Sequence, residues 1–388
     1  MQEKRNLHIA LLVNRESVYG QGIIRGVMSY VRPSKTWKVS IGRLSLKDIH
    51  KMVALKPDGM IAEVFSPRAA GILTDAGIPC IDVANVVGSS AIPKVCADSR
   101  EVGRLAAAHF LERGFSNFAY IGGKTANFAK LRQCGFAERL REHGHECAVF
   151  FKKLDLDFYG SNVLGEGSKP LHQWLLSLSK PVAVFACNDA FALIVNETCR
   201  QLGLHVPHQV AILGVDNDEQ YCQLETPATS SVVLPLRQIG FEGVRALEKL
   251  IHGTPHPPRL KALPPVEIIL RESTNTIAFK NEKLSEAIQF IRDNAHRPIS
   301  VDEVCRALYL SRRWLENNMK NQIGHSPLTE IHRVHVERAK TLLTHGGMTL
   351  PEIAMASGFR SPERMSILFK KLTGVSPSKY RKAFSALK

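Results

Sequence analysis

The side chains best suited to recognising another molecule lie near the carboxyl end of the chain, on one side of a predicted helix. After Ser311, apolar residues recur at four-residue steps (Leu315, Met319, Ile323), which predicts a helix that buries this side. Five polar residues remain on the opposite side: Arg312, Arg313, Glu316, Asn317 and Lys320. Guanidinium and amide groups can hydrogen-bond in pairs to base edges in the major groove. This face is therefore predicted to read double-stranded DNA.

The same pattern occurs a second time further along the chain. The segments 300–303 and 349–352 both have the spacing of a capping box, in which a hydroxyl and a carboxylate satisfy free amides at a helix start. Ser361-Pro362 then begins a helix whose inward side carries Met365, Leu368 and Phe369. Its outward residues are Glu363, Arg364, Ser366 and Ile367. One such face is typical of any solvated helix, but the repetition favours two helix-turn-helix units in tandem.

One long helix is predicted between the two units, from residue 328 to residue 345. At 1.5 Å per residue it spans roughly 27 Å, which is less than the turn of about 34 Å that separates successive major-groove segments. A rigid pair of recognition helices at this spacing is expected to bend the duplex modestly. The second outward set has fewer base-reading donors, so the first helix is expected to supply most of the sequence discrimination.

Length and composition agree with a DNA-binding protein of several domains. The 388 residues predict two or three domains, and the net charge of +15 favours a polyanionic partner. The eight cysteines contain no C-x-x-C pair, so buried reduced thiols are expected. The apolar stretch 9–13 is too short for a signal peptide or a membrane helix. A cytoplasmic protein with no membrane partner is therefore expected.

Before this tail, short apolar runs alternate with helical patterns. Continuous apolar strands separated by helices indicate parallel sheets covered on both faces, and thus an α/β region. The runs are 8–14, 59–64, 79–83, 118–122, 148–152, 182–186, 210–215, 231–234 and 266–270. A further strand is expected near Ile41.

The main enzymatic alternative is a dinucleotide-binding domain. Gly20-Gln21-Gly22 follows the first strand and begins a helix, but Arg25 stands where the fingerprint needs its third glycine. The sequence shows no metal-ligand spacing, nucleophile elbow or phosphate-binding loop. We expect neither an enzyme nor a bound cofactor or metal. A carbohydrate-binding or carbohydrate-processing protein with a basic tail is the alternative of a different class.

The tail resembles the AraC-type DNA-binding domain. The resemblance runs from about Leu284 to Phe384 and includes the segment GFRSPERMSILFKKLTGVSPSKYR. It implies an all-α domain with two helix-turn-helix motifs whose outward residues touch base edges. Those positions are the two outward sets given above.

The preceding region resembles the effector domain of LacI-type regulators, which is related to periplasmic sugar-binding proteins. The resemblance covers roughly residues 8–274 and rests on HFLERGFSNFAYIGG, AVFACNDAFAL, VAILGVDNDE and PPVEIILREST. It implies two parallel-sheet lobes with a ligand cleft at the carboxyl ends of the strands. The lobes are expected to be residues 7–113 with 236–258, and residues 114–234 with 260–274. Since the first strand starts near His8, no amino-terminal helix-turn-helix is expected.

Polar residues at the ends of strands are the candidates for binding the effector. Arg132 matches the family's cleft arginine, whose guanidinium can donate twice to vicinal hydroxyls. The other candidates are Asn188, Asp189, Asp216 and Asn217 in the second lobe, and Tyr19, Glu63 and Asp82 in the first. Helix caps and turns are the alternative for the second-lobe residues. For Arg132 the alternative is a surface salt bridge, and the first-lobe residues could lie in solvated loops.

The order of the two modules resembles that of bacterial regulators of pentose operons. The expected boundaries are a sensor at 1–274, a linker at 275–283 and a DNA-binding domain at 284–388. The resemblance implies a monosaccharide effector such as D-xylose, a homodimer on operator DNA, and contact with RNA polymerase if the protein activates. Effector binding is expected to close the lobes and change how the DNA-binding tails are presented. Another sugar, a sugar phosphate or a nucleobase remains open as the effector.

Overall fold

The computed structural model describes residues 6–34, 37–152, 168–224, 226–253, 260–276, 278, 281–345 and 347–385. Its contacts divide the chain into two compact units. The first contains Met1–His109 with Asn117–Asn275, and the second contains Phe110–Ser116 with Thr276–Lys388. The predicted fold class is confirmed, since two α/β lobes with largely parallel sheets are followed by a helical domain.

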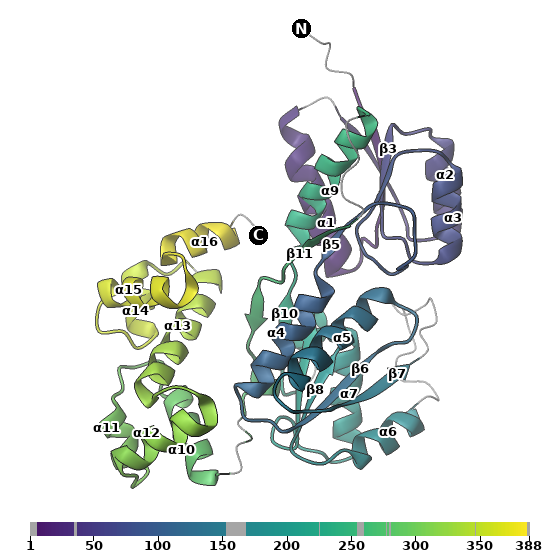
Figure 1. Cartoon of the computed structure of the whole chain (residues 1–388). Helices are drawn as coiled ribbons and strands as arrows, with labels where there is room; N and C mark the ends of the chain where they lie inside the picture. The colour runs from purple at the N-terminus through teal and green to yellow at the C-terminus, as the bar shows by residue number, and fades with distance from the viewer. Residues whose placement is uncertain are drawn as a thin grey trace. The chain divides into compact units, whose positions relative to one another are not determined.

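The first lobe is built on a parallel sheet with the strand order β11-β5-β4-β3-β1-β2. Its strands are β1 (His8–Leu12), β2 (Lys38–Gly42), β3 (Gly59–Ala62), β4 (Cys80–Asp82), β5 (Lys94–Ala97) and β11 (Leu260–Leu263). Figure 1 shows α1 (Val18–Val31) and α9 (Leu236–Ile251) on one face and α2 (Leu46–Ala54) and α3 (Pro67–Asp75) on the other. The central strands are buried on both sides, which explains their continuous apolar sequence.

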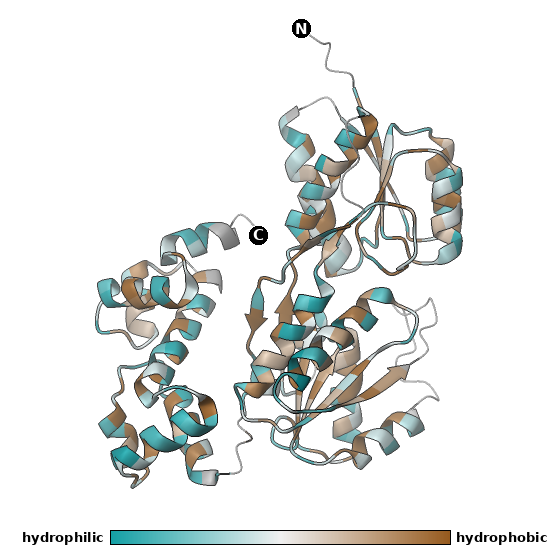
Figure 2. Cartoon of the chain, in the orientation of Figure 1, coloured by the Kyte–Doolittle hydropathy of each residue, from teal (hydrophilic) through white to brown (hydrophobic). Residues whose placement is uncertain are grey.

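The second lobe repeats this architecture with the order β12-β10-β9-β8-β6-β7. Its strands are β6 (Asn117–Gly123), β7 (Cys147–Lys152), β8 (Val182–Ala186), β9 (Val210–Val215), β10 (Ser230–Val233) and β12 (Glu267–Ile269), the last antiparallel to β10. Its helices are α4 (Ser99–Leu111), α5 (Asn127–Arg141), α6 (Ser168–Ser177), α7 (Asp189–Gln201) and α8 (Glu219–Cys222). Figure 2 shows the apolar strands lying between helices with mixed surfaces.

Two parts of the predicted lobe assignment are wrong. Strand β11 pairs with β5 in the first sheet, although residues 260–263 were assigned to the second lobe, and neither strand was predicted. Helix α4 was assigned to the first lobe but packs on α5 of the second. A Cβ at Gly103 would lie 2.1 Å from the carbonyl oxygen of Arg132, and one at Gly135 would lie 2.0 Å from that of Arg100. Only glycine permits this approach of the two backbones.

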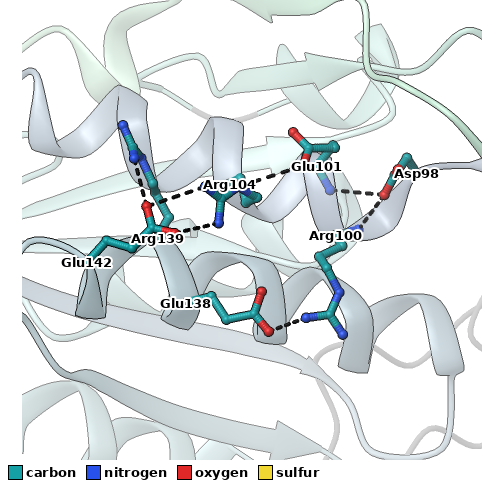
Figure 3. A network of polar contacts seen from close by, with 7 residues as sticks. All are labelled: Asp98, Arg100, Glu101, Arg104, Glu138, Arg139 and Glu142. Atoms are coloured by element: carbon teal, nitrogen blue, oxygen red, sulfur yellow. Dashed lines mark hydrogen bonds and ion pairs between the residues drawn. The ribbon is translucent and has the colours of Figure 1, made fainter.

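Ion pairs on the surface reinforce the contact between α4 and α5. Arg100 pairs with Glu138, and Arg104 Nη1 lies 2.8 Å from Glu142 Oε1 (Figure 3). Arg139 also approaches Glu142, at 2.7 Å, and the two arginines hold the pKa of that carboxyl down at about 2. The charges that join the helices lie on different segments of the sequence, so their pairing could not be predicted.

The second unit consists of α10 (Glu282–Asp293), α11 (Val301–Ala307), α12 (Arg312–Ile323), α13 (Pro327–His345), α14 (Leu350–Ala356), α15 (Pro362–Thr373) and α16 (Pro377–Ser385). It has two apolar cores. Helix α13 contributes Ile331 to the first core and Val336, Ala339 and Leu343 to the second. The long helix between the helix-turn-helix units therefore belongs to both cores.

The described cysteines are all free thiols, and six of the eight are buried. Across the described part of the chain, no helix combines the length and apolar character needed to cross a membrane.

Candidate functional site

Arg132 lies at the centre of the candidate effector site. It extends from α5, and only 3 % of its surface is exposed, so the alternative of a surface salt bridge is wrong. Its Nη1 donates to the carbonyl oxygen of Cys187, and its Nη2 lies 3.9 Å from Asp216 Oδ1. The guanidinium stands 5.0 Å from the ring centre of Phe128, which is one helical turn earlier. These contacts fix the direction of the arginine.

Asp216 follows strand β9 and has the positive φ of 104°, an unusual conformation for a residue other than glycine. Burial raises the pKa of its carboxyl to about 6, although the nearby Arg132 acts in the opposite direction. Its side chain as a whole retains 22 % exposure, although its Oδ1 is buried. A strained, partly desolvated carboxylate next to an arginine is typical of a binding site.

Three candidates come from the first lobe: Glu63 and Asp82 at the ends of strands, and Tyr19 in the first turn of α1. Glu63 follows β3 and accepts a hydrogen bond from the backbone of Asn14 at 2.9 Å, while burial raises its pKa to about 7. Asp82 ends β4 and accepts backbone hydrogen bonds from residues 64, 84 and 85 through Oδ1. The Tyr19 hydroxyl donates to the carbonyl oxygen of Val83 at 2.5 Å. They are held in place by the protein, so the alternative of solvated loops is wrong.

Residues of the two lobes are close enough to influence one another electrostatically. The negative charge of Asp216 raises the pKa values of both Tyr19 and Glu63, after the larger contribution of burial. Three atoms of this group are buried and have no hydrogen-bond partner in the described structure: Asp82 Oδ2, Asp216 Oδ1 and Arg132 Nε. Such atoms cost about 1 to 3 kcal/mol each when left unsatisfied. A ligand with several donors and acceptors would satisfy them.

The remaining three candidates are bonded within the protein. Asn188 caps α7 by accepting from the backbone of Phe191 at 3.0 Å. Asp189 accepts from the Ser231 hydroxyl at 2.6 Å and from the backbone of Asp218 at 2.7 Å, and burial raises its pKa to about 8. Asn217 accepts from Arg271 at 2.7 Å. The helix-cap alternative therefore holds for Asn188. Asp189 and Asn217 instead bind groups from distant segments of the chain, and these contacts hold the loop carrying Asp216.

Sequence reasoning missed Lys94 and Asn127. Lys94 is buried in β5, and its ammonium donates to Asn85 Oδ1 at 3.1 Å and to the carbonyl oxygen of Gly88 at 3.0 Å. Asn127 donates to the same Asn85 oxygen at 3.0 Å, joining the two lobes. The only sequence signal was a lysine at the start of a short apolar run. Among the described residues, no group of His, Cys, Asp and Glu is suited to hold a metal ion.

The first helix-turn-helix unit presents its predicted face as expected. Leu315 and Met319 of α12 are fully buried, whereas all five outward residues are exposed. Arg312 is engaged on both sides, because it lies 3.1 Å from Asp302 and 3.0 Å from Glu316. Arg313 has no ion-pair partner among the residues described. Arg313, Asn317 and Lys320 are thus the most available donors on this face.

The second helix-turn-helix unit presents a different outward surface. Glu363, Arg364 and Ile367 of α15 are exposed, Ile367 to 69 %, and Ser366 is half-buried. The predicted capping box at Thr349 is present in full. In the first helix-turn-helix unit only half of the predicted capping box forms. Ser300 accepts a hydrogen bond from the backbone of Glu303, but the Glu303 carboxylate pairs with Arg297 at 2.7 Å.

Comparison with protein families matches three parts of the chain. Residues 8–95 match the XylR N-terminal domain, residues 107–274 match a periplasmic binding protein-like domain, and residues 304–383 match a helix-turn-helix domain. The chain is therefore an AraC-type DNA-binding transcriptional regulator with a LacI-type sensor domain.

Two relatives that match nearly the whole chain are named as xylose operon regulators. The chain is 26 % identical to the xylose operon regulatory protein of Escherichia coli K12, over 96 % of each chain. Identity to the protein of that name in Haemophilus influenzae is 28 %, over 96 % of this chain and 97 % of the relative. The solved structure of the xylose-binding transcription activator XylR covers 99 % of both chains with a TM-score of 0.62 and 26 % identity. A complex of the regulator CelR with cellobiose, 22 % identical with a TM-score of 0.57, covers 70 % of this chain and shares its fold.

Proposed function

We propose that this protein regulates a pentose catabolic operon in response to an aldopentose such as D-xylose. The support is the similarity over nearly the whole chain to xylose operon regulators, together with the polar side chains that converge on Arg132. The effector would bind between Arg132 and Asp216 of the second lobe and Tyr19, Glu63 and Asp82 of the first.

The unsatisfied polar atoms are the single observation that carries this assignment. A pentose offers vicinal hydroxyls that can donate to Asp82 Oδ2 and Asp216 Oδ1 and accept from Arg132 Nε. The ring of Phe128 is a candidate for packing on the C–H face of the sugar. Three carboxyl groups at one site disfavour an anionic ligand such as a sugar phosphate, because each carboxyl that is ionised repels it. Asp189 and Asn217 would act indirectly, by holding the loop of Asp216, and Asn188 would act by capping α7.

The DNA-binding surface would combine both recognition helices. Helix α12 would enter the major groove with Arg312, Arg313, Glu316, Asn317 and Lys320, and α15 would follow with Glu363, Arg364, Ser366 and Ile367. A Cβ at Gly358 would lie 2.7 Å from the carbonyl oxygen of Arg297, so the turn of the second helix-turn-helix unit packs directly on the segment that leads into the first. This packing supports a rigid pair of units and modest bending of the operator.

The sensor would comprise residues 1–274, the connector 275–283 and the DNA-binding domain 284–388. Closure of the lobes around the sugar would change how a homodimer presents its DNA-binding domains to the operator and, for an activator, to RNA polymerase. Such coupling requires different sugar affinities in two states, typically by about 1 to 3 kcal/mol. The protein would act in the cytoplasm, where operator DNA is found.

A thermal-shift panel of aldopentoses and aldohexoses, with D-xylose first, tests the effector. At a hundredfold excess over its dissociation constant a ligand stabilises the folded state by about 2.7 kcal/mol. A selective shift with D-xylose is expected. A shift only with another sugar or a nucleobase would mean that this other ligand is the effector. A sugar that binds without changing operator affinity would refute the coupling between the sensor and the DNA-binding domain.

A further inference from the structure

The turn between α11 and α12 carries an unusually exposed tyrosine. Tyr309 is 96 % exposed, more than any other large hydrophobic side chain described. Its neighbours Leu308 and Leu310 are half-buried and pack against the apolar core of the helical domain that contains Leu315 and Met319. The backbone of Leu310 donates to Cys305 at 2.9 Å, which fixes the turn. The tyrosine ring is thus held out into solvent by an otherwise well-anchored turn.

The backbone of Tyr309 is also strained. Its φ is +54°, in the left-handed region, which is rare for a bulky residue. In the second helix-turn-helix unit the corresponding turn has Gly358 with φ +77°. There the glycine is needed, because a Cβ would lie 2.6 Å from His335 Nε2. A glycine would suit the first turn as well, yet the chain has a tyrosine there, whose side chain is almost fully exposed.

We propose that Tyr309 binds the sugar–phosphate backbone of the operator beside the groove that α12 enters. The proposal rests on the proposed DNA-binding function. The tyrosine lies two residues before Ser311, the cap of α12, and the amino-terminal residues of a recognition helix are those that reach base edges. A tyrosine hydroxyl is among the groups that donate to phosphate oxygens. The contact would set the register of α12 on the duplex and would carry no base preference.

The contact would make the two units unequal. The first turn adds a neutral hydrogen-bond donor and a ring against the DNA backbone, whereas the second turn has only Gly358 and packs on the protein. Because tyrosine is uncharged, its contact releases no counterion, unlike a contact made by lysine. Its removal should therefore weaken binding without changing the salt dependence.

The test uses full-length protein with two duplexes: a fragment selected from a random-sequence library by the wild-type protein, and a scrambled duplex of equal length. Tyr309→Gly is expected to weaken binding to both about tenfold, and Tyr309→Phe about threefold, because the latter loses the hydroxyl alone. The slope of log affinity against log salt should stay unchanged in both variants. Lys320→Ala is the contrast, since removing one cationic side chain that neutralises a phosphate charge lowers the magnitude of that slope by about 0.9.

The thermal unfolding temperature of Tyr309→Gly should equal or exceed that of wild type, because glycine relieves the left-handed strain. A lower temperature would overturn the proposal, since it would mean that Tyr309 stabilises the protein itself. Unchanged affinity would also overturn it, and unchanged affinity with lost transcription would point to a protein partner instead. If the wild-type protein bound neither duplex, the proposed DNA-binding function would fail first.

Discussion

The charged side chains at the candidate sites are buried in the sensor and exposed in the DNA-binding unit. In the sensor, Arg132, Glu63 and Asp82 are almost fully buried, and burial raises the pKa values of both carboxyl groups. In the DNA-binding unit, the outward residues of α12 are exposed, and Arg312 is neutralised only by surface ion pairs. Buried charges incur a desolvation cost before the ligand arrives, so each of them must be held by specific contacts. Exposed charges incur little cost and need only a helix that points them outward.

The largest expected effect concerns the buried arginine. Arg132→Ala should weaken effector affinity at least a hundredfold, or about 3 to 5 kcal/mol, because it leaves Asp216 without its counter-charge. Calorimetric titration with the sugar identified in the thermal-shift panel measures the loss. Arg139→Ala, on the same helix but 36 % exposed, is the matched control and should bind normally. Equal affinity in both variants would mean that the effector lies elsewhere.

The two units should also respond oppositely to pH. The folded-state pKa values of Glu63 and Asp189 are raised to about 7 and about 8, so the sensor should lose stability as pH rises from about 4 to 8. Burial and the nearby His332 lower the pKa of His335 from 6.5 to about 4. The unfolded state then binds the proton more tightly, so the DNA-binding unit should lose up to about 3 kcal/mol as pH falls from 6.5 to 4.

Differential scanning calorimetry of the full chain between pH 4 and pH 8 would reveal the opposite trends. Glu63→Gln should reduce the pH dependence of the sensor transition, and His335→Gln should reduce that of the DNA-binding transition. If both transitions moved in the same direction with pH, the contrast between buried carboxyls and a buried neutral histidine would be wrong.

A smaller effect is expected at the exposed face. Arg313→Ala should reduce discrimination between the selected operator and scrambled DNA by about 2 kcal/mol, the range of a good base contact. Arg312→Ala should cost less, because Asp302 and Glu316 already engage that side chain. Competition gel shifts at one fixed salt concentration measure both variants. If Arg313→Ala still discriminated fully between the operator and scrambled DNA, α12 would not be the main element that reads the base sequence.

The smallest expected effect compares two asparagines. Asn188→Ala removes the cap of α7 and should lower the free energy of unfolding by about 1 kcal/mol, with operator affinity unchanged. Asn317→Ala, on the exposed side of α12, should leave stability unchanged and weaken operator binding. Denaturant unfolding and gel shifts on both variants give the comparison. A stability loss in Asn317→Ala would show that this residue is structural.

The helical unit was largely predictable from sequence because its rules are local. The four-residue step at Leu315 and Met319 determined which side of α12 is buried, and Ser311 and Gly324 mark its ends. The missed feature depends on a competing partner outside the motif. Glu303 has the spacing of a capping box, yet it pairs with Arg297, which lies six residues earlier and competes for the same carboxylate.

In the sensor, most strands were predicted because a strand buried on both faces must be apolar along its length. Strands β5 and β11 escaped prediction because each has only four residues, with Lys94 at the start of β5 and Lys261 inside β11. The place of α4 depended on Gly103 and Gly135, whose role becomes visible only when α4 and α5 lie together.

The sequence alone determined the class of each domain, the inward and outward faces of the recognition helices, and the polar residues that end the strands. These follow from residue type and from a spacing of a few residues. Only the tertiary structure decided which polar residues are free to bind a ligand. Asp216 and Asp189 look alike in sequence, but hydrogen bonds from Ser231 and Asp218 engage Asp189, while Asp216 Oδ1 keeps no such partner. The difference arises because hydrogen-bond satisfaction depends on groups brought together from distant parts of the chain.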